Sequence, residues 1–130
     1  MFKINQIDET HLRFYGYYDT HVKYNFDSYK TAIENYKNKI NDMSFGTMKG
    51  GLFPINLSDI SHAIEDVDMD DNGMVCGTLK ILDTPNGRIL KEICNKCGTQ
   101  NISVVPVGTG KINDDKETTD IEIITFNIQS

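Results

Sequence analysis

The sequence predicts an α+β fold in which mainly antiparallel strands pack against two helices. Apolar residues recur at helical spacing between residues 28 and 42, so that they share one face of a helix. A second stripe of this kind, at residues 87–97, is followed by a glycine suited to the left-handed end of a helix. An Asp-Asp-Asn-Gly stretch at residues 70–73 lies between two strand-like runs and favours a tight antiparallel hairpin.

The two helices are the clearest elements of the sequence. Asp27 offers an oxygen that can cap the first helix, and Gly98 stands where the second helix should end. The apolar face of the first helix consists of Tyr29, Ala32, Ile33, Tyr36 and Ile40. The second helix is expected to bury Ile89, Leu90, Ile93, Cys94 and Cys97. Each apolar stripe needs a sheet to cover it.

The remaining apolar runs predict strands joined by polar or glycine-rich connections. The expected strands are residues 11–18, 60–67, 74–82, 102–107 and 121–128. Ile60, His62 and Ile64 fall on one side of their strand, and the last strand changes phase at Ile123-Ile124, which predicts a bulge. The stretches 45–54 and 111–119 are expected to be a glycine-punctuated loop and a charged loop.

Composition excludes several classes of protein. The chain has 130 residues, of which 38% are hydrophobic and 25% charged, so residues 1–130 are expected to form a single domain. Its formal net charge is -6 without a compensating basic cluster, which makes nucleic acid a poor partner. No apolar run approaches the roughly 20 residues that cross a bilayer, and residues 1–8 do not resemble a signal peptide. The three cysteines, an odd number, favour a reducing intracellular setting over a disulfide framework.

Two stretches begin like metal sites, but neither is complete. Residues 68–73 start like a calcium loop, yet Leu79 occupies the twelfth position, where a bidentate glutamate belongs. Cys94 and Cys97 have the spacing of a zinc half-site, but the chain contains no second pair with that spacing. We therefore expect a solvated turn and core cysteines, with no metal or cofactor.

Two other patterns only weakly suggest a phosphate-binding loop and a serine–histidine pair. The stretch Gly108–Lys111 lacks the residues that a phosphate-binding Walker loop requires at Val105 and Ile112, so it is expected to form a tight bend. His62 and Ser103 are a base and a nucleophile in type, but nothing in the sequence places them together. A hydrogen-bonded structural histidine is the expected role of His62.

Residues 77–92 (GTLKILDTPNGRILKE) resemble a characteristic stretch of the bacteriophage prohead, or capsid maturation, proteases. That family carries the same Ile-Leu-Asp-Thr-Pro, Asn-Gly, basic residue, Ile-Leu-Lys order. Residues 61–64 are similar to its serine–histidine strand, and residues 107–110 and 123–128 fall at matching intervals. The first helix, running into residues 45–48, resembles the helix before the family's catalytic loop.

The resemblance implies a fold, a setting and a change of function. The fold would be a small, mainly antiparallel β-barrel, shared with the herpesvirus assemblins, with flanking helices at about 28–42 and 87–97. The setting would be the host cytoplasm or the virion.

The family's catalytic histidine follows a Gly-Glu-Leu segment, whereas residues 46–51 here contain no histidine. Its nucleophile lies in a Ser-Ser-Arg-Gly run, at positions occupied here by Val105, Pro106 and Val107. A hydroxyl needs an adjacent base to attack an amide, so the resemblance implies a degenerate, non-enzymatic member.

The family's substrate cleft then becomes the candidate binding groove. Its expected lining is Lys49, Gly50, Val105, Pro106, Val107, Gly108, Thr109, Gly110 and Lys111. The first hypothesis is a phage protein that binds another protein, a capsid or assembly component, by strand addition. The second is a small-ligand binder, such as a decoy for a host defence nucleotide, with Lys49 or Lys111 facing the anion. The third is an active serine protease that uses Ser103 and His62. Exposed strand edges also allow a homo-oligomer.

Overall fold

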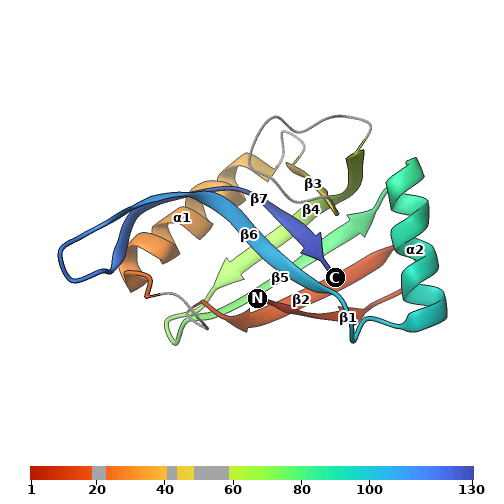
Figure 1. Cartoon of the computed structure of the whole chain (residues 1–130), viewed down its shortest axis with the longest axis horizontal. Helices are drawn as coiled ribbons and strands as arrows, with labels where there is room; N and C mark the ends of the chain where they lie inside the picture. The colour runs from red at the N-terminus through yellow and green to blue at the C-terminus, as the bar shows by residue number, and fades with distance from the viewer. Residues whose placement is uncertain (19–22, 41–43, 49–58) are drawn as a thin grey trace.

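The computed structural model describes residues 1–18, 23–40, 44–48 and 59–130 (Figure 1). Its strands are β1 Lys3–Gln6, β2 His11–Tyr17, β3 Ser44–Thr47, β4 Ile60–Met69, β5 Met74–Ile81, β6 Ser103–Ile112 and β7 Thr118–Gln129. Its helices are α1 Phe26–Lys39 and α2 Pro85–Cys97. The strands pair antiparallel throughout the described sheets, so the predicted α+β class with mainly antiparallel strands is confirmed.

The strands form two sheets. Five strands pair in the order β1-β2-β5-β4-β3, while β6 and β7 form a long two-stranded hairpin that extends past the rest of the molecule (Figure 1). One antiparallel bridge links the sheets, because Phe2 and Val104 exchange both of their backbone hydrogen bonds, at 2.8 and 2.9 Å. On the other side β7 lies against β3 without backbone pairing in the described residues. The closed barrel that the resemblance implied is therefore not confirmed by these pairings.

Aromatic side chains from distant parts of the chain fill the space between the two sheets. The rings of Phe2, Phe14 and Phe126 lie with centroids 5.3–6.3 Å apart, and Tyr36 of α1 meets Phe126 edge-on at 5.2 Å. All four residues are almost fully buried. Burial of apolar surface on this scale is the main favourable term in folding, and here it holds the β6–β7 hairpin and α1 onto the five-stranded sheet.

The predicted apolar face of α1 is confirmed, but its cap is not the expected residue. Tyr29, Ala32, Ile33 and Tyr36 are all buried. The helix begins at Phe26 rather than 28 and ends at Lys39 rather than 42. The cap is Asn25, whose Oδ1 accepts a hydrogen bond from the Ser28 amide at 2.9 Å. Asp27 lies within the first turn, where a carboxylate favours the positive end of the helix dipole.

Helix α2 buries a narrower stripe than the sequence predicted. Thr84 caps its start, Leu90 and Cys94 are buried, and Gly98 ends it with a positive φ of 72°, as expected. The predicted burial of Ile89 and Cys97 is wrong, since Ile89 is 51% exposed and Cys97 is also exposed. Only one side of α2 contacts the sheet, and these two residues do not lie on that side.

Within the described residues no helix is long and apolar enough to cross a membrane.

The predicted strands occur at the expected positions, but two further strands were not predicted. The hairpin at residues 70–73 is confirmed, with φ of 90° at Gly73 and with Asp70 Oδ1 accepting from the amides of Asn72 and Met74. The strands β1 and β3 were not predicted, and residues 44–47 form a strand where a glycine-punctuated loop had been expected from residue 45. The expected charged loop at 111–119 is shorter, because β6 continues to Ile112 and β7 begins at Thr118.

The predicted bulge in the last strand is also confirmed. Val107 pairs with Thr125, but the next residue, Gly108, pairs with Ile123, which leaves Ile124 as the extra residue on β7. A second shift in register follows between Thr109 and Lys111. Both irregularities lie on β7, so β6 keeps its regular alternation. Bulges increase the local bend of a strand pair, in keeping with the curved course of this hairpin in Figure 1.

Candidate binding site beside the open edge of β6

A serine does meet His62 in the described residues, but it is Ser61 and not Ser103. The Oγ of Ser61 lies 2.7 Å from Nδ1 of His62, and Nε2 of His62 lies 2.8 Å from the carbonyl oxygen of Phe126. A carbonyl can only accept, so Nε2 carries the proton and Nδ1 accepts the hydroxyl proton of Ser61. Burial lowers the pKa of His62 from 6.5 to about 4, although the bond to Phe126 opposes this shift.

This pair fastens β4 to β7 inside the protein. Ser61 and His62 are each 0% exposed, so a substrate has no access to either side chain in this structure. The backbone of β3 crosses the same point, because a Cβ on Gly46 would lie 2.2 Å from Nε2 of His62 and 2.4 Å from the Phe126 oxygen. Only glycine fits there. The arrangement matches the hydrogen-bonded structural histidine that the sequence predicted.

Two more side chains join β3 to β7. The hydroxyl of Thr125 donates to the Phe45 carbonyl at 2.5 Å, and the amide of Thr47 donates to Oδ1 of Asn127 at 3.0 Å. Thr125 and Asn127 are each 2% exposed. We call the contacts of His62, Thr125 and Asn127 across to β3 and β7 the side-chain seam. It replaces the backbone ladder that a continuous sheet would have at this place.

Ser103 and His62, which the third hypothesis of an active protease requires to act together, are not brought together. Ser103 pairs with Gln129, three residues along β7 from Phe126, to which His62 is bonded. At about 3.3 Å per strand residue this separation is roughly 10 Å. The hydroxyl of Ser103 lies instead 3.6 Å from the sulfur of Met1.

The edge of β6 that faces away from β7 is open beyond Val104. Both backbone groups of Val104 point to that edge, where they bond Phe2. Because alternate residues of a strand direct their backbone groups to the same edge, Pro106, Gly108, Gly110 and Ile112 face it too. None of these four pairs with a strand on that side in the described part of the chain. Pro106 has no amide hydrogen, so its carbonyl alone is available.

A hollow of about 270 Å³ lies beside this open edge. Its lining consists of Tyr24, Tyr29, Pro106, Gly108, Thr109, Gly110, Ile112, Thr118, Ile121, Glu122 and Ile123. Four of the predicted groove residues, Pro106, Gly108, Thr109 and Gly110, are among them. Val105, Val107 and Lys111 lie in β6 but are not part of the lining, and Lys49 and Gly50 lie outside the described residues.

Sequence reasoning missed the other side of this hollow. Tyr24 lies just before α1 and Tyr29 lies in its first turns, both about 80 residues before the part of β6 that they face. They reach β7 because residues 23–25 run alongside Thr118, whose amide donates to the Lys23 carbonyl and whose carbonyl accepts from the Asn25 amide, both at 2.8 Å. Nothing local in the sequence signals this pairing, since Tyr29 alone reads as a core residue of a helix.

The polar side chains in the lining of the hollow differ in charge and in exposure. Glu122 is the charged residue among its described lining. Tyr29 is 2% exposed, and its hydroxyl is buried with no hydrogen-bond partner within the described residues. Burial, together with the neighbouring Tyr24, raises the pKa of Tyr29, so this hydroxyl keeps its proton and can donate. A buried donor without a partner costs stability until something accepts from it.

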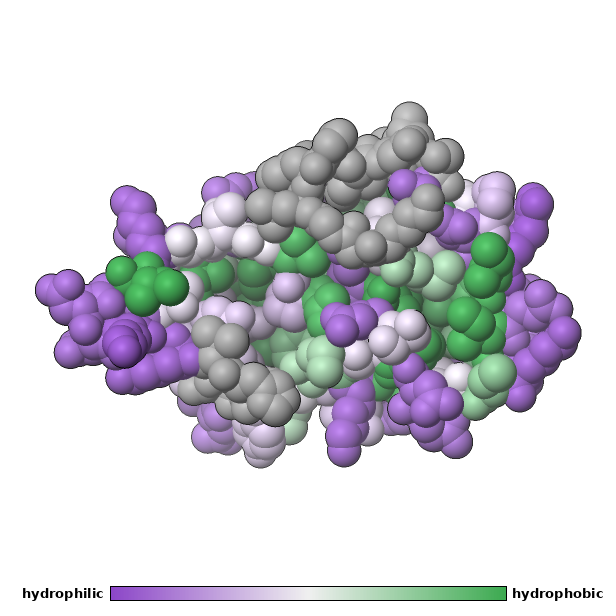
Figure 2. Space-filling view, in the orientation of Figure 1, coloured by the Kyte–Doolittle hydropathy of each residue, from purple (hydrophilic) through white to green (hydrophobic). Residues whose placement is uncertain are grey.

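The projecting end of the β6–β7 hairpin is hydrophilic. Figure 2 shows polar side chains gathered at the projecting end of the β6–β7 hairpin, with one hydrophobic patch among them. Ile112, which lies at this end of β6, is 75% exposed. No group of three His, Cys, Asp or Glu residues within the described ranges lies close enough to hold a metal ion.

Comparison with known proteins identifies the fold but not a family. No family model matches the sequence, and no curated protein matches it significantly. Among solved structures, the chain is similar to the capsid assembly protease gp21 of bacteriophage T4, with a TM-score of 0.73 and 13% sequence identity. The match covers 100% of this chain and 96% of that protease. The fold is therefore prohead-protease-like, as the resemblance in sequence predicted.

Proposed function

We propose that this chain is a non-catalytic phage protein that binds an extended segment of a capsid or assembly protein along the open edge of β6. The similarity to a phage capsid assembly protease supports a role in head assembly, since the fold extends over the whole chain. The lack of a catalytic role rests on the residues themselves. Val105, Pro106 and Val107 stand where the family's nucleophile would lie, and the Ser61–His62 pair is buried.

The open edge of β6 is the observation that carries this proposal. Residues 106–112 would extend over about 20 Å as a strand, which suits a partner segment of about seven residues. The carbonyl of Pro106 and both backbone groups of Gly108, Gly110 and Ile112 are directed to that edge. Strand addition uses such groups for affinity and neighbouring pockets for specificity. The hollow beside Tyr29 supplies a pocket of this kind.

Two features of the hollow favour a protein partner over a small anionic ligand. Its volume of about 270 Å³ is below the roughly 300–1,000 Å³ of typical small-molecule sites, but it admits one large side chain. Its charged lining residue in the described chain is Glu122, which would repel a phosphate. Lys111, which the sequence suggested as an anion contact, is not part of the lining.

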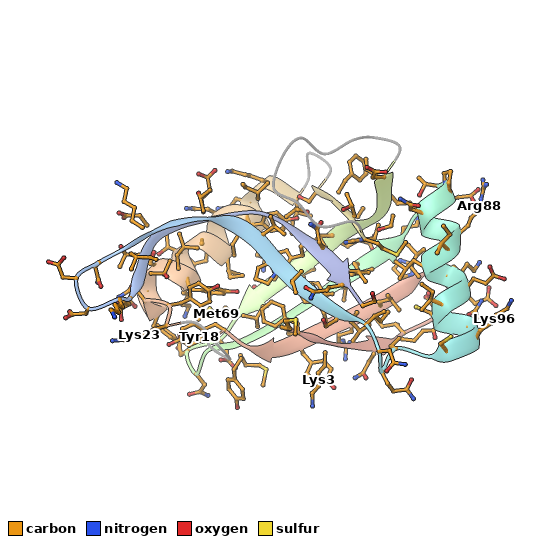
Figure 3. All side chains as sticks on the ribbon, viewed as in Figure 1. Lys3, Tyr18, Lys23, Met69, Arg88 and Lys96 are labelled. Atoms are coloured by element: carbon orange, nitrogen blue, oxygen red, sulfur yellow. The ribbon has the colours of Figure 1, made fainter. Side chains whose placement is uncertain are left out.

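The test is capture of the capsid and scaffold proteins of the phage that encodes this chain. The purified protein is immobilised, incubated with each candidate, and the masses of bound and free candidates are measured. We expect capture without any change in mass. Ile112→Glu should weaken capture at least tenfold, while Ile89→Glu, at an exposed apolar position on α2, should leave it unchanged. Figure 3 marks α2 by Arg88 and Lys96, at the opposite end of the molecule from the hairpin.

Three results would contradict the proposal. Cleavage of a candidate that is lost in Ser103→Ala or Ser61→Ala would show an active protease. Equal capture by the Ile112→Glu variant would move the binding surface away from β6. A large rise in melting temperature with a nucleotide, and none with the captured protein, would favour the small-ligand function.

A further inference from the structure

We infer that the segment bound along β6 is basic, and that one of its apolar side chains enters the hollow that Tyr24, Tyr29 and Ile123 help to line. This inference rests on the proposed function and names the chemistry of the partner. Three observations support it: the charge of the β6–β7 hairpin, the absence of ion pairs that would neutralise this charge within the described residues, and a hollow with aromatic and aliphatic side chains in its lining.

The hairpin carries a large share of the negative charge of the chain. Between residues 109 and 123 there are five carboxylates, Asp114, Asp115, Glu117, Asp120 and Glu122, and two lysines, Lys111 and Lys116. The segment therefore has a formal charge of 2 − 5 = −3, half of the net −6 of the whole protein. Lys23, labelled in Figure 3, lies beside the start of β7 and reduces this charge without balancing it.

The carboxylates of the hairpin have no cationic partner within the described residues, whereas several carboxylates elsewhere do. Elsewhere, Lys30 pairs with Asp71, Lys37 with Asp68 at 2.6 Å, and Arg88 with Asp83 at 2.8 Å. No carboxylate of residues 109–123 forms an ion pair with any side chain of the described ranges. Glu117 accepts a hydrogen bond from the neutral amide of Asn25 at 3.0 Å. An added strand carrying Lys or Arg would supply the missing charges.

The hollow gives the position of the apolar side chain. Its lining includes Gly108 and Gly110, beside which a partner strand would lie, together with Tyr24, Tyr29 and Ile123. Glu122 stands at the same hollow. Alternate side chains of an added strand point the same way, so an apolar residue in the hollow would have its neighbours at two positions before and after on the same face. Lysines at those two positions would lie closest to Glu122.

The same charges disfavour a second copy of this chain as the occupant. Pairing of two β6 edges would bring two hairpins of charge −3 together in proteins of net charge −6, and like charges at short range repel. A basic segment gains from the same field, both in affinity and in the rate of encounter.

The test is an NMR titration of the ¹⁵N-labelled full chain with three peptides. They are acetylated and amidated Thr-X-Thr-Leu-Thr-X-Thr, with X as Lys, Gln or Glu. We expect the Lys peptide to bind at least tenfold more tightly than the Gln peptide and the Glu peptide to bind least. The amide signals of Gly108 and Gly110 should shift most. Raising the salt concentration should weaken the Lys peptide alone, because screening acts on charges.

Charge reversal at one position sharpens the test. Glu122→Lys should bring the Lys and Gln peptides to within about threefold of each other, whereas Glu92→Lys, on the distant helix α2, should keep the preference. Equal binding of all three peptides at Gly108 and Gly110 would overturn the basic partner while leaving strand addition intact. Absence of binding by every peptide would also overturn it, and capture of whole assembly proteins would then decide the proposed function separately. If light scattering shows a dimer, and the Ile112→Glu variant is a monomer, the open edge of β6 binds a second copy of this chain instead.

Discussion

The two long edges of the β6–β7 hairpin, which we call its margins, differ in whether their polar groups have hydrogen-bond partners within the described protein. Along β7, the seam of His62, Thr125 and Asn127 is buried and closed by hydrogen bonds to carbonyl and amide groups. Along β6, the margin is open past Val104, with Gly108, Gly110 and Ile112 exposed and without a neighbouring strand in the described chain. One hairpin is thus fixed on one side and free on the other.

We therefore expect the margin along β7 to contribute to the stability of the fold and the margin along β6 to contribute to binding. A buried polar group that loses its partner costs free energy, so changes in the side-chain seam should destabilise the fold. An exposed strand edge has its backbone groups hydrated, so changes there should alter association more than folding. The four predictions below follow this comparison from the largest effect on the free energy of unfolding to the smallest.

Gly46→Ala should have the largest effect. Its Cβ would come within 2.4 Å of both His62 Nε2 and the Phe126 oxygen, so the His62–Phe126 bond would have to break or β3 would have to move. We expect a loss of about 4 kcal/mol in urea unfolding, or failure to fold. The matched control is Gly16→Ala, whose nearest contact would be a Phe2 ring carbon at 3.0 Å, and it should cost about 1 kcal/mol or less. Equal losses would mean that the seam is not tightly packed.

Stability should fall between pH 6.5 and pH 4 because of His62. Its folded-state pKa of about 4 lies below the ordinary value of 6.5, so the unfolded state binds the extra proton in this window. The linked loss on acidification grows to about 3 kcal/mol near pH 4 and disappears well above pH 6.5. Urea unfolding at pH 7.0 and 4.5 measures it, and His62→Gln should remove most of the difference.

A carboxylate gives the control for this pH dependence. The amide of Thr10, with the His11 side chain, lowers the pKa of Asp8 from 3.8 to about 2, so its effect arises only below pH 3.8. A loss confined to pH below 4, and unchanged by the His62 substitution, would contradict the role given to the buried imidazole.

Thr125→Val should cost about 1 kcal/mol, since it keeps the shape of the side chain and removes the hydrogen bond to the Phe45 carbonyl. Thr109→Val, on the exposed face of the same hairpin, should change stability by less than about 0.5 kcal/mol. Thermal unfolding of the two variants side by side measures the difference between the two margins. A larger effect at Thr109 would reverse the comparison.

Ile112→Glu should have the smallest effect on folding. The side chain is 75% exposed, so its replacement should change the free energy of unfolding by no more than about 0.5 kcal/mol. Denaturant midpoints of this variant and the wild type should coincide within error. A marked loss would show that Ile112 packs against the protein, and the reduced capture expected of this variant would then reflect folding rather than binding.

Local patterns in the sequence were sufficient to predict seven of the nine described elements, all except β1 and β3. The α1 face, the hairpin at residues 70–73, the glycine end of α2 and the bulge at Ile123-Ile124 each depend on neighbours within a few residues. The strands β1 and β3 have four residues each and too little alternation to be recognised alone. They form because the five-stranded sheet offers them an edge to pair with.

What the sequence by itself determined is therefore the class of the fold, both helices and most of the strands. Spacing, capping and turn chemistry act over short distances and can be read directly. Only the tertiary structure decided which edge of β6 is open, that Tyr24 and Tyr29 help to line the hollow, and that His62 bonds a carbonyl 64 residues away. These features arise from contacts between segments far apart in the chain, and no local pattern fixes which segments will meet.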